Sequence, residues 1–103
     1  MLLLVIVCEE LVWRGWVQCE LRARYGPRSA WLGSALAYAG MHLPSLFTLA
    51  DPAAGMNPLL VAAALGGGLC WGLLALRTRR LAPGLLSHAV FSYFAVRAAW
   101  WFM

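Results

Sequence analysis

The fold is decided by residues 8–15, Cys8-Glu9-Glu10-Leu11-Val12-Trp13-Arg14-Gly15. Two adjacent carboxylates follow a run of uncharged residues, and an arginine comes four positions after the second carboxylate. Ionisable side chains inside an apolar segment are energetically costly, so they are usually paired and usually functional. The stretch therefore predicts a polar site held inside a membrane.

Composition extends this interpretation to the whole chain. Of the 103 residues, 63% are hydrophobic and 12% are charged, whereas a soluble domain is about half apolar and about a quarter charged. We therefore predict one domain over residues 1–103, an all-α polytopic membrane protein with a bundle of about four transmembrane helices. The net charge of +4 comes from arginines near the connections. It indicates membrane orientation and not a nucleic-acid partner.

Four apolar runs are separated by glycine, proline and arginine. The expected helices are residues 1–25, 29–50, 58–76 and 83–103. Pro44 must kink or end the second helix, because it removes a backbone donor. Trp31 is expected to anchor that helix at the membrane interface. The glycine-rich third helix is assigned a packing role.

Arginines mark the predicted connections. Those near the first connection are Arg22, Arg24 and Arg28, and those of the third are Arg77, Arg79 and Arg80. The second connection carries only Asp51. Because basic loops stay in the cytoplasm, we expect the first and third connections there and both chain ends outside.

The two glutamates are expected to differ in role, because adjacent helical residues point about 100° apart. Glu10 has Arg14 at i+4, the favourable order for an ion pair. Glu9 lacks such a partner and suits a general base. In the alternative, both carboxylates and Arg14 only satisfy one another near the surface. Glu10, Arg14, Gln18 and Arg22 form one polar stripe, which predicts that the second half of this helix emerges into the interface or the cytosol.

The only two histidines lie in later apolar segments. Tyr38 precedes His42 by four residues and Ser92 follows His88 by four, so each pair shares a helix face. A single histidine on an apolar helix is more often a hydrogen-bonded core residue than a catalyst. Burying two histidines and two glutamates without a function would cost several kcal/mol. We therefore expect Glu9, His42 and His88 to converge on one cavity.

Taken in order, these motifs resemble the CPBP family, the CAAX-protease and bacteriocin-processing (Abi, Rce1-like) intramembrane proteases. The family pattern is EExxxR, then an aromatic residue followed by xxxH, then HxxxN or HxxxD. Here it reads Glu9-Glu10-xxx-Arg14, Tyr38-xxx-His42 and His88-xxx-Ser92. Ser92 departs from the pattern. Family members also usually have membrane helices before the first motif. Residues 1–103 are thus read as the core of a larger family fold, either truncated at the N-terminus or with a first helix that enters the bilayer partway.

The resemblance implies an intramembrane endopeptidase, a hydrolase that cleaves near the C-terminus of a membrane-anchored protein or peptide, in CAAX-type or bacteriocin-type processing. Glu9 and His42 would activate a water molecule, and His88 with Ser92 would stabilise the oxyanion. The supporting residues would be Glu10, Arg14 and Tyr38. No cofactor is required in the favoured mechanism. A zinc-dependent version would use Glu9, His42 and His88 as ligands.

The implied partners are membrane lipid and the membrane-anchored substrate. The implied location is the bacterial cytoplasmic membrane, with the active site toward the cytosolic side. Two alternatives belong to other functional classes. One is a non-catalytic immunity or scaffold protein of the same fold, which the serine at position 92 favours. The other is a haem-binding helical bundle with His42 and His88 as axial ligands.

Overall fold

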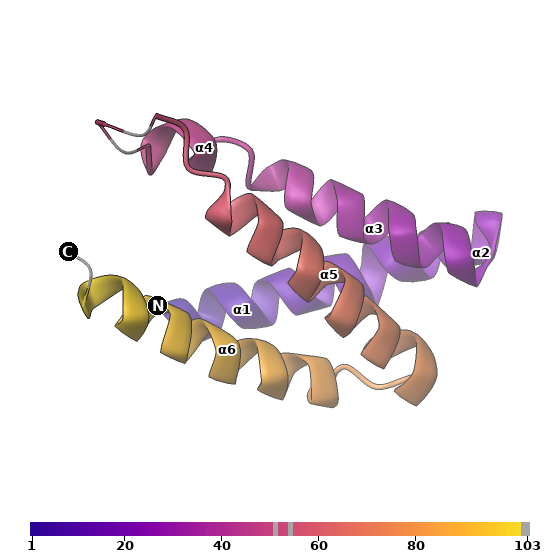
Figure 1. The fold of residues 1–103 in the computed structure, drawn as a ribbon. Coiled ribbons are helices and arrows are strands. Elements are labelled where there is room, and N and C mark those ends of the chain that lie inside the picture. The colour runs from indigo at the N-terminus through magenta and orange to yellow at the C-terminus, as the bar shows by residue number, and fades with distance from the viewer. Residues whose placement is uncertain (51, 54, 102–103) are drawn as a thin grey trace.

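The computed structural model describes residues 1–50, 52, 53 and 55–101, and contains no β-strand within them. This confirms the predicted all-α class. The helices are α1 (Leu2–Glu10), the π-helical η1 (Leu11–Val17), α2 (Gln18–Tyr25), α3 (Pro27–Met41), α4 (Ser45–Thr48), α5 (Leu59–Thr78) and α6 (Ala82–Trp101). Figure 1 shows their order. Asp51 and the last two residues of the predicted fourth helix lie outside the described residues.

The first three elements form one continuous rod, as predicted for residues 1–25. Its middle turn is π-helical, a feature that often occurs at functional sites; Arg14 lies within it. The rod ends at Gly26, whose φ of 88° lies in the left-handed region that favours glycine. Pro27 then begins α3, a position that proline tolerates because the first helical N–H has no partner.

The second predicted helix, residues 29–50, is divided. It consists of the 15-residue α3 and the 4-residue α4. Pro44 cannot donate a backbone hydrogen bond, and its ring disfavours helical geometry at the preceding residue. The helix therefore ends at Met41, as the proline predicted, and resumes as the short α4.

Fewer helices than expected are long and apolar enough to span a membrane. Within the described residues, α5 alone is long and apolar enough to cross a bilayer. A span needs about 20 mainly apolar residues; α3 has 15, and α1 has 9, of which the last two are Glu9 and Glu10. The four predicted helical segments are present, but a four-span bundle is not confirmed.

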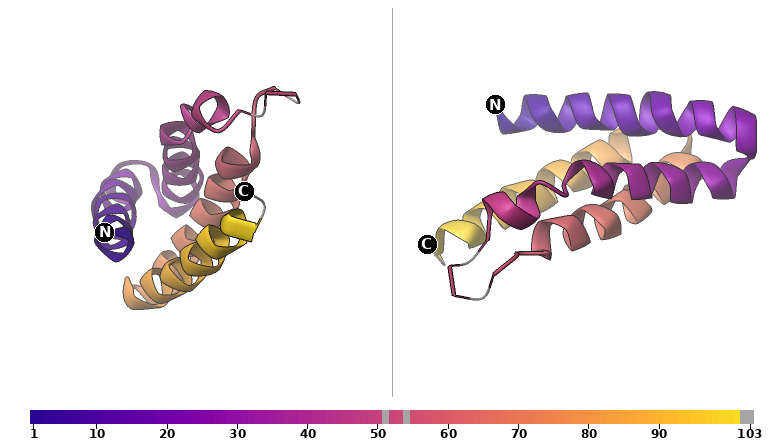
Figure 2. Two further views of the ribbon diagram at one scale, coloured as in Figure 1. Left: turned by 90° about the vertical axis from the view of Figure 1, so that its left-hand side faces the viewer. Right: turned by 90° about the horizontal axis from the view of Figure 1, so that it is seen from above.

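The helices pack as a bundle in which α5 contacts both α3 and α6. The rod closes the bundle by packing α2 against α3 and α1 against α6, as the two views in Figure 2 show. Close approach depends on Gly68, where a Cβ would lie 3.3 Å from the Cα of Ala35. Both arginine-bearing connections lie at one end of the bundle, opposite the start of α1 (Figure 1).

Polarity is inverted relative to a soluble protein. The buried side chains include Glu10, Arg14, Gln18 and His88, whereas large apolar side chains such as Leu11 are exposed along the rod and the other helices. The polar stripe of the rod thus faces the bundle interior as far as Gln18, whereas Arg22 is exposed. That the second half of this helix emerges into the interface or the cytosol stays a prediction. An apolar exterior around a polar interior is the arrangement expected in lipid.

Candidate active site

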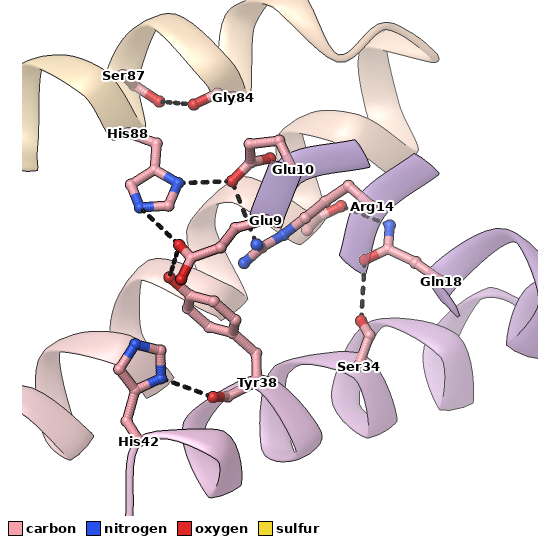
Figure 3. A network of polar contacts seen from close by, with 11 residues as sticks. Glu9, Glu10, Arg14, Gln18, Ser34, Tyr38, His42, Gly84, Ser87 and His88 are labelled. Atoms are coloured by element: carbon pink, nitrogen blue, oxygen red, sulfur yellow. Dashed lines mark hydrogen bonds and ion pairs between the residues drawn. The ribbon is translucent and has the colours of Figure 1, made fainter. Parts of the chain in front are cut away.

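Glu10 is the most deeply enclosed charge in the described structure, with 1% of the residue exposed. Its Oε1 accepts hydrogen bonds from Arg14 Nη1 at 3.2 Å and from His88 Nδ1 at 2.8 Å. The i+4 pairing with Arg14 was predicted, whereas the bond from His88 was not. Gly84 leaves room for this carboxylate, because a Cβ there would lie 3.4 Å from Oε2. Figure 3 shows Glu10 joined to Arg14 and His88.

Arg14 is held between aromatic rings as well as by its carboxylate. Its Cζ lies 4.6 Å from the ring centre of Tyr38 and 5.6 Å from that of Trp71. A guanidinium over an aromatic face is attracted by the ring quadrupole, most strongly where water is excluded. Arg14 therefore fixes Glu10 from one side and orders the rings of two other helices.

Glu9 lies one residue away but has a different environment. Its Oε2 accepts a hydrogen bond from the Tyr38 hydroxyl at 3.1 Å and lies 3.7 Å from His88 Nε2. The Glu9 side chain is 18% exposed, compared with 2% for Glu10. The angular separation of adjacent helical residues thus directs one carboxylate into the interior and the other toward open space.

His88 connects the two carboxylates. Because an ionised carboxylate can only accept, Nδ1–H donates to Glu10, and Nε2 is the atom that faces Glu9. The Trp71 indole stacks on the imidazole with a centroid distance of 3.9 Å and an interplanar angle of 17°. Gly67 makes this stacking possible, since a Cβ there would lie 2.5 Å from the indole. The His88 ring is therefore fixed in both orientation and tautomer.

His42 lies at the end of α3, beyond the last helical turn. Its Nδ1 is 2.8 Å from the Tyr38 carbonyl oxygen, and its ring packs edge-on against the Tyr38 ring at 4.8 Å. It makes no hydrogen bond to Glu9 or Glu10 in the described part of the chain. Figure 3 shows His42 apart from the Glu10 cluster, just past the end of the helix that carries Tyr38.

A cavity of about 150 Å³ brings the predicted residues together. Its polar lining consists of Glu9, Tyr38, His42, His88 and Ser92, and its other walls are apolar or aromatic. Glu10 and Arg14 do not line it. The arrangement offers one carboxylate, two imidazoles and two hydroxyls around a space that can hold water and part of a peptide.

From the sequence, Trp71 had no expected role in the site, and Gln18 had only a place in the polar stripe. Trp71 carries no charge and belongs to the helix that was assigned only a packing role. Gln18 extends the buried polar stripe: its Nε2 donates to the Gly72 carbonyl and its Oε1 accepts from the Ser34 hydroxyl, both at 3.0 Å. The four-residue spacing after Arg14 was the available signal for Gln18; for Trp71 the sequence offered none.

Metal and haem fit this arrangement poorly. In residues 1–50, 52, 53 and 55–101, no group of three or more His, Cys, Asp and Glu side chains could hold a metal ion. For a haem, His88 would have to leave its bond to Glu10 and its stack on Trp71, since one nitrogen and one ring face are already occupied.

Comparison with known proteins gives one match. A family model described as Rce1-like, type II CAAX prenyl endopeptidase, matches residues 1–94. This range contains all three motifs and every residue that lines the cavity. No curated protein and no solved structure is found to match the chain.

Proposed function

Because the chain belongs to the Rce1-like family of type II CAAX prenyl endopeptidases, we propose that it is an intramembrane endopeptidase that uses Glu9 as its base. The family is a membrane-embedded protease family. The proposed substrate is a membrane-anchored protein or peptide, cleaved near its C-terminus. The proposed location is a bacterial cytoplasmic membrane; the cavity is lined by the start of α1, away from the arginine-bearing connections.

The single observation that carries this proposal is the difference between the two glutamates. Glu9 borders the cavity, whereas Glu10 is enclosed by Arg14 and His88. A general base must reach the proton that it abstracts, directly or through one water molecule. Glu9 meets that requirement, and Glu10 orients the groups around it.

The reaction is then a hydrolysis by activated water. Glu9 removes a proton from a water molecule in the cavity while the water oxygen attacks the scissile carbonyl carbon. Tyr38 orients the carboxylate through its hydroxyl. His42 borders the same cavity and holds the water from the opposite side. The proton on Glu9 passes to the amine as the peptide bond breaks, so the base is regenerated.

His88 and Ser92 stabilise the oxyanion in this proposal. Nδ1 donates to Glu10, and Nε2 lies 3.7 Å from Glu9 Oε2 at the edge of the cavity, where an Nε2–H can donate to the oxyanion. Preorganised donors of this kind account for about 10²–10³ in rate each. Ser92 has a shorter side chain than the family's amide or acid, and Ser92→Asn should therefore keep or raise activity.

The decisive experiment compares two isosteric changes. We expect Glu9→Gln to lower cleavage of a membrane-anchored reporter peptide by about 10²–10⁴-fold, the contribution typical of a general base, with unchanged helicity. Glu20→Gln is the matched control, because it makes the same change on the same rod at an exposed site. His42→Ala should lower activity to a similar extent, and the double variant should be little worse than either, since the two groups act as one unit.

Each other outcome has a definite meaning. Activity that survives Glu9→Gln contradicts the proposed base. Loss of activity with a chelator and its recovery with zinc would assign Glu9, His42 and His88 to the metal-dependent version. Absence of cleavage by the wild-type chain over a broad substrate set would favour the non-catalytic scaffold.

A further inference from the structure

A second cavity, of about 340 Å³, lies at the arginine-bearing end of the bundle. It is formed by η1 and α2 on one side and by the end of α5 with the connection to α6 on the other. Its polar lining is made mostly of arginines: Arg14, Arg22, Arg79 and Arg80. Arg14 is buried and forms part of the wall nearest the Glu10 cluster, whereas the other three are exposed around it.

Three of these arginines lack a carboxylate partner. In the described part of the chain, Arg14 pairs with Glu10 and Arg24 pairs with Glu20. No described carboxylate lies within ion-pair distance of Arg22, Arg79 or Arg80. The cavity is therefore surrounded by three uncompensated positive charges, and its electrostatics select an anion.

The position of the cavity along the bundle indicates the source of that anion. Helix α5, the apolar candidate span, ends at Thr78, and Arg79 and Arg80 follow it directly. Arg79 turns the chain with a left-handed φ of 55°, and the Thr78 hydroxyl bonds the Arg80 backbone N–H at 3.3 Å. These arginines thus emerge at the depth where lipid headgroups begin, and basic pockets between membrane helices bind anionic headgroups there.

We propose that this cavity binds the phosphate group of an anionic glycerophospholipid, with Arg22, Arg79 and Arg80 as its ligands. Guanidinium groups match phosphate oxygens with paired N–H donors. Inorganic phosphate shares this chemistry and differs in carrying no acyl chains. The inference goes beyond the proposed protease function, because binding is measured without any substrate cleavage. Arg14 links the cavity to the active site, since it lines one and bonds Glu10 in the other.

The test is lipid retention by the full chain. Protein is purified in nanodiscs that contain phosphatidylcholine with a minor fraction of phosphatidylglycerol, and the lipids that remain bound are counted by native mass spectrometry. The triple variant Arg22→Gln/Arg79→Gln/Arg80→Gln removes the three ligands. The triple variant Arg24→Gln/Arg28→Gln/Arg77→Gln is the matched control, because it removes three arginines that do not line the cavity.

We expect both the wild type and the control triple to retain phosphatidylglycerol in preference to phosphatidylcholine. The ratio of the two retained lipids should agree within about twofold between these proteins. The cavity triple should lose this preference by about tenfold or more, since each arginine near a charged bilayer surface contributes roughly fivefold. Equal losses in both triples would show diffuse surface attraction and overturn the site. Arg22→Gln alone changes one ligand on α2, away from the connection, and should lower the preference for phosphatidylglycerol partially. This single variant also serves if the cavity triple fails to fold: an unchanged preference in Arg22→Gln would overturn the proposal.

A competition arm separates the two phosphate sources. Inorganic phosphate at millimolar concentration should leave lipid retention by the wild type unchanged, because it gains nothing from acyl chains. Complete displacement of phosphatidylglycerol by inorganic phosphate would contradict a lipid site and assign the cavity to a soluble anion.

Discussion

The rod formed by α1, η1 and α2 carries two glutamate–arginine pairs with the same spacing and very different surroundings. Glu10–Arg14 and Glu20–Arg24 are both i,i+4 pairs, with N–O distances of 3.2 and 3.7 Å. Each side chain of the first pair is 2% exposed, whereas those of the second are 71% and 56% exposed. The spacing therefore determines that a contact forms, and burial determines how much that contact matters.

The largest effect should follow from removing the buried arginine. Arg14→Met leaves Glu10, whose side chain is 2% exposed, without its guanidinium, and we expect the free energy of unfolding to fall by about 3–5 kcal/mol. Arg24→Met, the matched change in the exposed pair, should lower it by at most about 0.5 kcal/mol. Thermal unfolding in detergent, followed by circular dichroism, measures both. Similar losses of unfolding free energy in the two variants would contradict the conclusion that burial makes the Glu10–Arg14 pair matter more than the exposed pair.

A double variant sharpens the same comparison. Glu10→Gln/Arg14→Met removes the charge that Arg14→Met leaves uncompensated. We therefore expect the double variant to be more stable than Arg14→Met alone, because a buried pair depends mainly on neither partner being left by itself. A double variant less stable than the single would show that Glu10 finds sufficient compensation from His88.

Much of the fold followed from the sequence because proline and glycine act locally. Gly26-Pro27 and Pro44 end helices through their own backbone restrictions, and the structure has breaks at both places. The direction of the polar stripe could not be obtained in this way. Periodicity shows that Glu10, Arg14 and Gln18 share a face, but the packing of α3 and α5 decides that this face is inside.

In the candidate site, too, contacts within one helix were predictable and contacts between helices were not. The i+4 pair Glu10–Arg14 was predictable, since both partners lie on one helix. The bond from His88 to Glu10 joins residues 78 positions apart, and the stack of Trp71 on His88 joins α5 to α6. Trp31 donates its indole N–H to the Leu69 carbonyl at 2.7 Å, a contact that the sequence did not predict. Such contacts depend on the angles between helices, which a single sequence does not specify.

Helix α5 offers a second matched comparison, with an intermediate effect. Gly68→Ala would bring a Cβ within 3.3 Å of the Ala35 backbone, and we expect overpacking to lower the free energy of unfolding by about 1–3 kcal/mol. At Gly66 no atom lies within 4 Å of an added Cβ. Gly66→Ala should therefore raise stability by up to about 1 kcal/mol, the difference in helix propensity. Opposite signs in the same unfolding assay would support the α3–α5 contact, and equal signs would contradict it.

The smallest effect should come from the exposed end of the rod. Glu20→Gln removes the partner of Arg24, and surface i,i+4 pairs contribute about 0.3–0.5 kcal/mol. That contribution should vanish at 1 M salt, where the screening length is about 3 Å, because water and ions reach both side chains. The difference between Arg14→Met and the wild type should persist at the same salt concentration, since both side chains of that pair are 2% exposed and buried pairs are screened much less. Parallel unfolding curves at low and high salt measure both differences. A salt-independent effect at Glu20 would mean that this end of the rod is shielded from solvent, contrary to its exposure.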